Sequence, residues 1–347
     1  MKTVAKELLP VWLLQILISF YAFFRRKKSV YHFKKTYKKD MLRYLKHSRT
    51  LDSNNPDKMI GAIVLQYHVI EKGLTMPETR PGFGRERIKS LCISCIDFIL
   101  KYGSSDEQIK HAIGVILEYK DYHDNSGFQL DNELLALISR LKNLSEEPVK
   151  CSKQIQTTKD EYFRHTSSTF CDFSNSRSSV RNYGLETLDI QKILKSIELS
   201  RNTPSACNRQ SWRTYIYTDT KKVGQILEIQ GGNRGFGHLA NKLVVIAGEL
   251  GGFCYTNERN QVYVDGGMYA MNLLYALHSN KVAACILNCS FDFDKEMEVK
   301  KICEIKNSEV LIAMISCGEA PSEFKIAVSP RYSIGKTNKT IETLSLK

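Results

Sequence analysis

The stretch Arg177-Ser-Ser-Val-Arg181 marks the point where long helical patterns give way to alternating helices and strands. After it, apolar residues recur at helical spacing or stand in short unbroken runs. Strands are predicted at 214–218, 243–247, 282–287 and 310–317, and helices at 190–197, 221–229, 267–279 and 294–303. This order predicts an α+β domain over residues 173–335, with a sheet flanked by helices.

The residues before this domain follow a different pattern. Helical periodicity at 59–70, 88–102, 109–119 and 130–144 predicts an N-terminal helical region over residues 29–145. Residues 146–172 are polar, rich in Ser and Thr and without periodicity, which is typical of a linker. Residues 336–347 are predicted to form a C-terminal tail.

The positive charge of the chain is concentrated at its N-terminus. The 347 residues are 42% hydrophobic and 25% charged, a globular composition, and the net charge is +13. Residues 1–50 hold +11 of that charge, so the remainder is nearly neutral. A nucleic-acid-binding domain would carry basic residues over its folded surface. We therefore predict no nucleic-acid partner.

Residues 1–28 form an apolar and basic segment of their own. The apolar run at 8–24 is followed by Arg25-Arg-Lys-Lys28. A secretory signal would place its basic residues before the apolar run, so it fits poorly. Three interpretations stay open: a spanning helix, a helix lying on the cytoplasmic face of a membrane, and a helix packed on the chain's own core or on a partner. The remainder of the protein is expected in the cytoplasm.

The ten cysteines show no disulfide rhythm. Cys92 and Cys95 have C-x-x-C spacing within an apolar-periodic segment at 88–100. Zinc needs four ligands, and no second pair of ligands lies at a useful distance. We therefore predict buried free thiols and no metal site.

The alternating positions of Arg177, Ser179 and Arg181 suggest an anion site. In an extended segment these three side chains share one face. Two guanidinium groups and a hydroxyl on one face suit a phosphate. The loop Pro204-Ser-Ala-Cys-Asn-Arg-Gln-Ser-Trp212 is rich in small and hydrogen-bonding residues, which suits the approach of a flat ligand with polar edges.

These motifs, in their order, resemble the opening of the nitroreductase family. The resemblance rests on R-x-S-x-R, a helix and P-S-x-x-N-x-Q-x-W, and continues through the glycine cluster at 231–237, the helix at 265–274, Cys285-Ile-Leu-Asn288 and Ser329-Pro-Arg331. It covers about residues 173–335. In the helical region, E-K-G-L-x-M-P at 71–77 and P-G-F-G at 81–84 resemble nitroreductase-like proteins of bacterial polysaccharide biosynthesis clusters.

The resemblance implies a bound flavin mononucleotide (FMN) and names the residues that would hold it. Arg177 and Ser179 would bind the phosphate, with Arg331 and its neighbour Ser329 beside it. Arg181 would lie at the N1/O2 edge of the flavin ring, where a cation favours reduction. Further contacts would come from Pro204, Ser205 and Asn208, in the same chain or from the second subunit of a homodimer, from Asn233 or Arg234, and from Asn288 near N5.

The resemblance implies an FMN-dependent oxidoreductase that takes hydride from NAD(P)H and reduces a small-molecule acceptor. No catalytic side chain is expected, because the cofactor supplies the chemistry. The alternative is a flavin-fold scaffold at a membrane-associated assembly that has lost turnover. Two features keep it open: the stretch 286–289 lacks the acidic residue of the family pattern, and an N-terminal half is added before the resembling domain.

Overall fold

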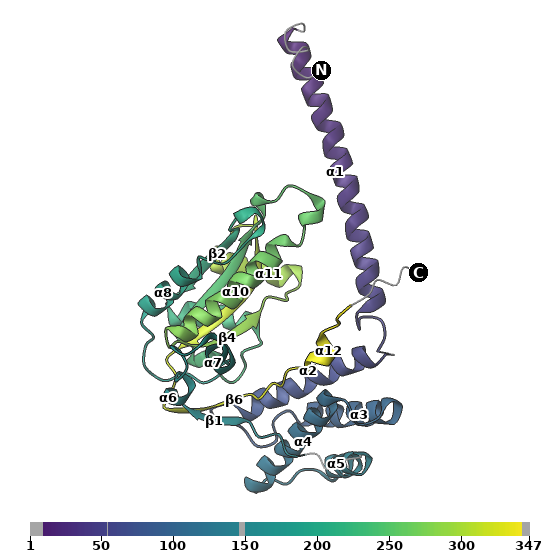
Figure 1. The fold of residues 1–347 in the computed structure, drawn as a ribbon, viewed down its shortest axis with the longest axis vertical. Helices are drawn as coiled ribbons and strands as arrows, with labels where there is room; N and C mark the ends of the chain where they lie inside the picture. Colours follow the sequence, from purple (N-terminus) through teal and green to yellow (C-terminus); the bar gives the residue numbers. More distant parts are fainter. Residues whose placement is uncertain (1–9, 54, 146–149, 342–347) are drawn as a thin grey trace. The chain divides into compact units, whose positions relative to one another are not determined.

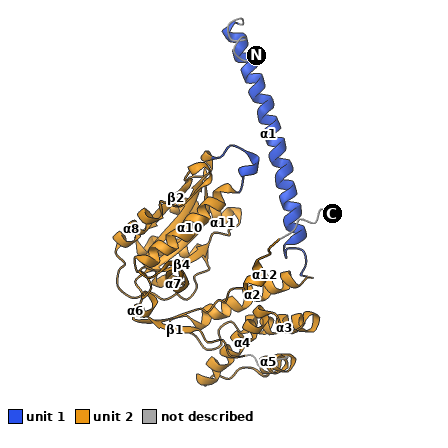
Figure 2. Ribbon diagram, viewed as in Figure 1, with its two compact units in different colours: residues 1–53, 253–260 blue, residues 54–252, 261–347 orange. Residues whose placement is uncertain are grey.

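The computed structural model describes residues 10–53, 55–145 and 150–341 (Figure 1). Predictions for residues 1–9, for 146–149 of the expected linker and for 342–347 of the tail lie outside the described residues. The described chain divides into two compact units (Figure 2). One unit contains residues up to 53 together with 253–260, and the other contains the remainder.

The first unit is built on the long helix α1 (Val11–His47), none of whose side chains is buried. The helix therefore continues through the basic cluster well beyond the apolar run predicted at 8–24. The short helical turn η5 (Thr256–Glu258) belongs to the same unit, and beside it Arg259 Nε donates to Asp40 Oδ2 at 2.6 Å. Among the described residues, no helix is long and apolar enough to cross a membrane.

The predicted helical region, 29–145, spans both units, because α1 runs through the expected boundary at residue 28. The four helices predicted from periodicity lie in the second unit and are confirmed. They are α2 (Pro56–Leu74), α3 (Arg85–Tyr102), α4 (Glu107–Asn125) and α5 (Asn132–Leu144). Asn55, Asp106 and Asp131 cap the first turns of α2, α4 and α5 by accepting from backbone N–H groups. The apolar stripes meet in one core, where Cys92 and Cys95 are fully buried free thiols, as predicted.

The residues expected to form a linker contain structure. Strand β1 (Ile155–Thr158) pairs antiparallel with β6 (Glu323–Ile326), and α6 (Lys159–Tyr162) follows it directly. Tyr162 and Phe163 are buried in the core of the α+β domain. The segment 155–163 was not predicted because it is mostly polar, and of its side chains only Tyr162 and Phe163 are packed into that core. Helix α7 (Phe170–Ser176) then leads into Arg177.

The centre of the α+β domain is a four-stranded antiparallel sheet in the order β2-β3-β5-β4. Its strands are β2 (Trp212–Tyr217), β3 (Lys242–Glu249), β4 (Ala283–Asn288) and β5 (Glu309–Gly318), close to the predicted positions. The helices are α8 (Ile190–Ser200), α9 (Thr220–Gln230), α10 (Gln261–Ser279), α11 (Phe293–Cys303) and the short α12 (Ile334–Thr337).

Alternating residues of β3 join the two hydrophobic cores of this domain. Leu243, Val245 and Ala247 pack into the core that includes α9 and α11. Val244 and Ile246 pack into the core that includes α8 and α10, which lie side by side in Figure 1. A strand buried on both faces reads as an unbroken apolar run, as β3 does. The predicted α+β architecture, a sheet flanked by helices behind an N-terminal helical region, is confirmed.

Candidate functional site

The segment Arg177-Ser-Ser-Val-Arg181 runs beside the edge strand β4. Arg177 ends α7 with extended backbone angles (φ −73°, ψ 121°), and the Val180 N–H donates to the Ala284 carbonyl at 3.0 Å. Val180 is fully buried in the domain core. Tyr162 further fixes the segment because its hydroxyl donates to the Ser178 carbonyl at 2.5 Å. The segment is therefore held by β4 through Val180 and by Tyr162 through Ser178.

The three polar side chains of this segment gather around Cys285 of β4. The Ser179 side chain hydrogen-bonds to the Cys285 thiol, and Arg177 and Arg181 are close enough to act on its pKa. Burial nevertheless raises the pKa of Cys285, so the thiol stays protonated and unreactive. The three side chains that were predicted to share one face thus lie near the same residue of the edge strand, Cys285.

Arg177 has a donor without a partner. Its Nε atom is buried and makes no hydrogen bond to the residues that the structure describes. Its neighbour His278, near the end of α10, is bonded through Nε2 to Ser176 Oγ at 2.9 Å. Burial, and then the charge of Arg177, lower the pKa of His278 to about 4, so this imidazole is neutral and cannot add a second charge. A buried guanidinium donor left open in this way suits an anion.

Arg181 is a buried cation near a second cation. Its side chain is only 8% exposed and makes no ion pair with any described residue. Lys72 of α2 lies close by, and desolvation followed by the charge of Arg181 lowers the pKa of Lys72. Two like charges withdrawn from water without an acid between them are costly, and a bound anion would remove that cost. We call Arg177, Ser179, Arg181 and Lys72 the cationic cradle.

Sequence reasoning did not assign Lys72 to the site. Lys72 also acts on the pKa of Cys285, so it gathers at the same place as the other three residues. It lies in the E-K-G-L-x-M-P motif, which was recognised only as a resemblance. The motif itself was the available signal, but nothing in the spacing indicated that α2 approaches β4.

The glycine loop after α9 separates the two residues that were predicted as alternatives. Asn233 is buried, and its side-chain amide donates to the Leu227 carbonyl and to Gln230 Oε1, so it closes the end of α9. Arg234 is exposed and makes no hydrogen bond or ion pair with the described residues. The Asn288 carbonyl accepts from Gln230 Nε2 at 3.1 Å, which places Asn288 beside this loop. Of the two alternatives, Arg234 is the one with free donors.

The loop with Pro204, Ser205 and Asn208 lies at the opposite end of α10 from Arg177. The Ala206 N–H donates to the Asp265 carboxylate at 3.3 Å, near the start of α10, whereas Ser176 bonds to His278 near its end. Thirteen residues of helix between these two positions correspond to about 20 Å. One chain therefore does not bring this loop to the cationic cradle.

Ser329 and Arg331 lie against α2. The Ser329 N–H and hydroxyl donate to the Glu71 carboxylate at 3.3 and 3.5 Å, and Arg331 Nη1 donates to the Ser329 carbonyl. Ser329 thus reaches the residue next to Lys72. The structure shows no hydrogen bond between the described Ser329 or Arg331 and Arg177 or Ser179.

Glu71 is fully buried and is held by two histidines as well as by Ser329. His111 Nε2 lies 2.7 Å from one carboxylate oxygen and His68 Nδ1 lies 3.2 Å from the other. Burial alone would raise the pKa of Glu71, but the hydrogen bonds from His111 and His68 outweigh it and lower the pKa to about 2. The carboxylate therefore stays charged and fastens the C-terminal segment to α2.

Residues 175–234 match the model of the nitroreductase family. No curated protein matches the chain. Among solved structures, a putative NADH oxidase from Clostridium acetobutylicum is 20% identical, covering 50% of this chain and 99% of that one, with a TM-score of 0.42. An FMN-dependent nitroreductase from Clostridium difficile R20291 is 15% identical, with coverage of 50% and 98% and a TM-score of 0.41.

A nitroreductase family protein from Streptococcus pneumoniae TIGR4 is also 15% identical, covering 50% of this chain and 100% of that one, with a TM-score of 0.44. The residues that match the family model run from the end of α7 to the glycine loop. They include Arg177, Ser179 and Arg181 of the cationic cradle. This part of the chain is therefore similar to the nitroreductase family in sequence.

Proposed function

We propose that the protein is an FMN-dependent NAD(P)H oxidoreductase of the nitroreductase type. The observation that carries the proposal is the cationic cradle. Among the described residues, the buried Nε of Arg177 has no hydrogen-bond partner, and the buried Arg181, near Lys72, has no acid paired with it. The match of residues 175–234 to the nitroreductase family supports the same conclusion. Bound flavin would supply hydride chemistry between NAD(P)H and a small-molecule acceptor.

The residues of the cradle fit the two charged ends of FMN. Arg177 and Ser179 offer a guanidinium and a hydroxyl to the phosphate, and Arg331 would assist from the C-terminal segment. Arg181 and Lys72 would hold the N1/O2 edge of the flavin ring, where they stabilise negative charge. Arg234, rather than Asn233, has donors available for the ribityl or pyrimidine side. Asn288 would stand near N5.

A homodimer would complete this site. Pro204, Ser205 and Asn208 lie at the far end of α10 from the cradle within one chain. Cys207 and Asn208 have positive φ angles of 53° and 55°, a conformation that costs energy for residues other than glycine and that recurs at binding loops. We propose that this loop approaches the flavin of the second subunit.

The direct test is the colour of the purified protein. The proposal expects a yellow protein that releases FMN on denaturation and is bleached by NADH or NADPH. A colourless protein that takes up no added FMN would contradict it and would favour the scaffold alternative. The acceptor is proposed to belong to surface-polysaccharide biosynthesis, on the resemblance of the E-K-G-L-x-M-P motif alone.

Arg181→Gln is expected to retain FMN but to lower its reduction potential by roughly 30–60 mV, which corresponds to one lost charged interaction of about 1.5–3 kcal/mol for a two-electron couple. Reduction by NAD(P)H should slow accordingly. The potential is measured by equilibration with reference dyes. Arg201→Gln is the matched control, because Arg201 is exposed and paired with Glu198. An unchanged potential with flavin bound would place Arg181 away from the ring.

We also propose that the start of α1 binds the surface of a membrane, leaving the flavin domain in the cytoplasm. Trp12 and Phe20 are 61% and 62% exposed, and Arg25-Arg-Lys-Lys28 follows them on the same helix. Apolar burial contributes roughly 1.5–3 kcal/mol for each side chain and each basic residue near an anionic surface about 1 kcal/mol.

This attachment is expected to be released from isolated membranes by high salt, and deletion of residues 1–28 should abolish it while leaving flavin content and thermal stability unchanged. Retention through salt and carbonate washes would instead indicate an integral segment. Full-length protein found entirely in the soluble fraction at low salt would contradict attachment, and destabilisation on deletion would indicate a packing helix.

A further inference from the structure

A pocket of about 420 Å³ lies between the loop after α2 and the glycine loop after α9. Lys72 of the cradle is one of its lining residues, so the pocket adjoins the proposed flavin site. It is lined by Val69, Ile70, Lys72, Gly73, Met76, Glu78, Thr79, Arg80, Phe83 and Gly84 on one side and by Gly231, Gly232, Arg234 and Gly235 on the other. We call it the glycine-loop pocket.

Two glycines allow close packing around this pocket, one within a wall and one between the two walls. A Cβ at Gly73 would lie 2.1 Å from the Phe83 ring, so only glycine lets Phe83 pack against α2. Gly235 has φ +90°, and a Cβ there would lie 3.0 Å from Met76 Sδ. The motifs E-K-G-L-x-M-P and P-G-F-G thus form one wall and touch the glycine loop at Met76.

Hydrogen bonds hold the loop after α2 in place. The Thr79 hydroxyl donates to the Gly73 carbonyl at 3.1 Å, and the Tyr122 hydroxyl donates to the Thr79 carbonyl at 2.5 Å. The Gly82 N–H donates to His123 Nε2 at 2.8 Å. Because this loop is bonded to the helical region at Thr79 and Gly82, this wall of the pocket is preformed and a ligand need not order it.

The charges that line the pocket are unbalanced. Lys72, Arg80 and Arg234 make no ion pair with any residue that the structure describes, and the lining contains one acid, Glu78. The lining also contains the apolar residues Val69, Ile70, Met76 and Phe83. A pocket with an apolar lining and uncompensated guanidinium groups suits a ligand with an apolar body and an acidic group.

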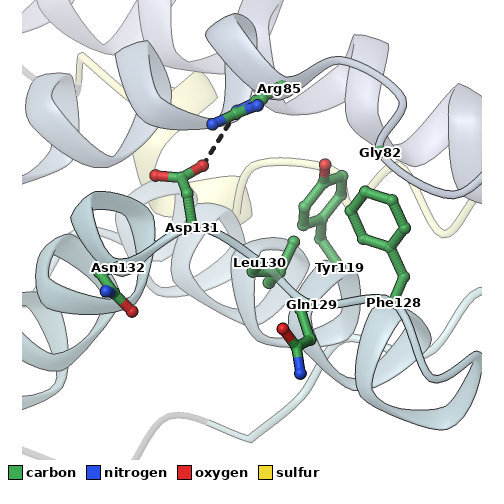
Figure 3. Close-up of a pocket in the computed structure, with 8 residues that line it drawn as sticks. All are labelled: Gly82, Arg85, Tyr119, Phe128, Gln129, Leu130, Asp131 and Asn132. Carbon is green, nitrogen blue, oxygen red and sulfur yellow. Dashed lines mark hydrogen bonds and ion pairs between the residues drawn. The ribbon is translucent and has the colours of Figure 1, made fainter.

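A second pocket of similar size shows that this imbalance is not general. It has a volume of about 390 Å³ and lies between the start of α3 and the start of α5, with Gly82 in its lining (Figure 3). Its cation, Arg85, donates to Asp131 at 3.0 Å, as the dashed line in Figure 3 shows. Among the described residues this second pocket therefore has no unpaired cation. The glycine-loop pocket has three; Lys72 and Arg234 are also proposed to contact FMN, so Arg80 is the cation left for the substrate alone.

We infer that the glycine-loop pocket binds the substrate that exchanges electrons with the flavin, and that this substrate is a small molecule combining an apolar part with a carboxylate or phosphate. The inference rests on the proposed function, because Lys72 joins the pocket to the cationic cradle. It assigns to the helical region, through its two motifs, the recognition of the substrate.

The test measures equilibrium binding of three probes to the purified full-length protein by titration calorimetry. Benzoate and phenyl phosphate carry the two acidic groups on the same ring, and benzamide is their neutral counterpart. Arg80→Gln removes a cation that belongs to the pocket alone and is expected to weaken binding of the anionic probes about 10-fold, the low end of the range for a charged hydrogen bond. Arg140→Gln, an exposed cation of α5 outside the pocket, should have no effect.

The inference expects benzoate, phenyl phosphate or both to bind more tightly than benzamide, with flavin content equal in both variants. Equal binding of benzamide, or undiminished binding of the anions to Arg80→Gln, would overturn it. Release of bound FMN by the probes would also overturn it, because the probes would then occupy the position of the flavin itself. Anion binding that depends on Arg80 in a protein that takes up no FMN would retain the pocket and reject the proposed function.

Discussion

Replacing Arg177 with alanine is expected to lower the affinity for FMN by about 10- to 150-fold, the effect of losing a charged hydrogen bond of roughly 1.5–3 kcal/mol. The Arg177 Nε atom is buried and has no hydrogen-bond partner in the part of the chain that the structure describes, so the phosphate would be its main partner. Binding is measured by titrating the apoprotein and following the quenching of flavin fluorescence. If this variant purifies with full flavin occupancy, the phosphate assignment is wrong.

The same variant separates a binding role from a structural one. Arg177 forms no ion pair with an acid among the described residues, and its charge lowers the pKa of His278. Removing this buried charge should therefore leave the thermal stability of the apoprotein unchanged or raise it. Arg164→Ala is the matched control, since Arg164 is exposed and paired with Glu161 nearby in the chain. Loss of flavin together with loss of apoprotein stability would indicate that Arg177 holds the fold instead.

Glu71→Ala is expected to lower the free energy of unfolding by about 3–5 kcal/mol, the loss typical of removing one partner from a buried charged network. His111, His68 and Ser329 would all lose their acceptor. Urea denaturation measures the loss. Glu71→Gln should cost less because it keeps one acceptor oxygen, and the exposed Glu228→Ala should cost little. A change below about 1 kcal/mol would show that the network does not hold the C-terminal segment.

The pH dependence of stability follows from the same carboxylate. The pKa of Glu71 is about 2 in the folded protein and near its usual value of 4.5 when unfolded. Its stabilising contribution is therefore fully present above about pH 4.5 and is lost as the pH falls toward 2. Glu71→Gln should lose less stability than the wild type over that window. Parallel acid titrations of the two proteins would contradict the assigned cause.

Strands and helices were predictable where the apolar pattern of their own residues indicates the secondary structure. The unbroken apolar run of β3 and the helical spacing of α2 to α5 come from residues near one another in the chain. Strand β1 was not predictable, because its polar residues are held by pairing with β6 near the other end of the domain. A strand stabilised by a distant partner leaves little local pattern.

Part of the candidate site was likewise predictable from local sequence, and part was not. The common face of Arg177, Ser179 and Arg181 follows from the two-residue period of extended backbone. Our proposal of Arg234 instead of Asn233 depends on the end of α9, where Asn233 closes the helix. Both residues are polar and adjacent, so the sequence alone does not distinguish a capping role from a binding role.

The sequence by itself determined the α+β order of elements, the helical region before it, the concentration of charge at the N-terminus and the alternating cations of the cradle. These depend on local periodicity and on counting charges. Only the tertiary structure decided that Lys72 of α2 lies near Arg181, that two glycine-bearing loops enclose a cationic pocket, and that α10 separates Asn208 from Arg177. Such proximities arise when buried faces pack together, and the spacing of residues along one element does not specify which other element will cover it.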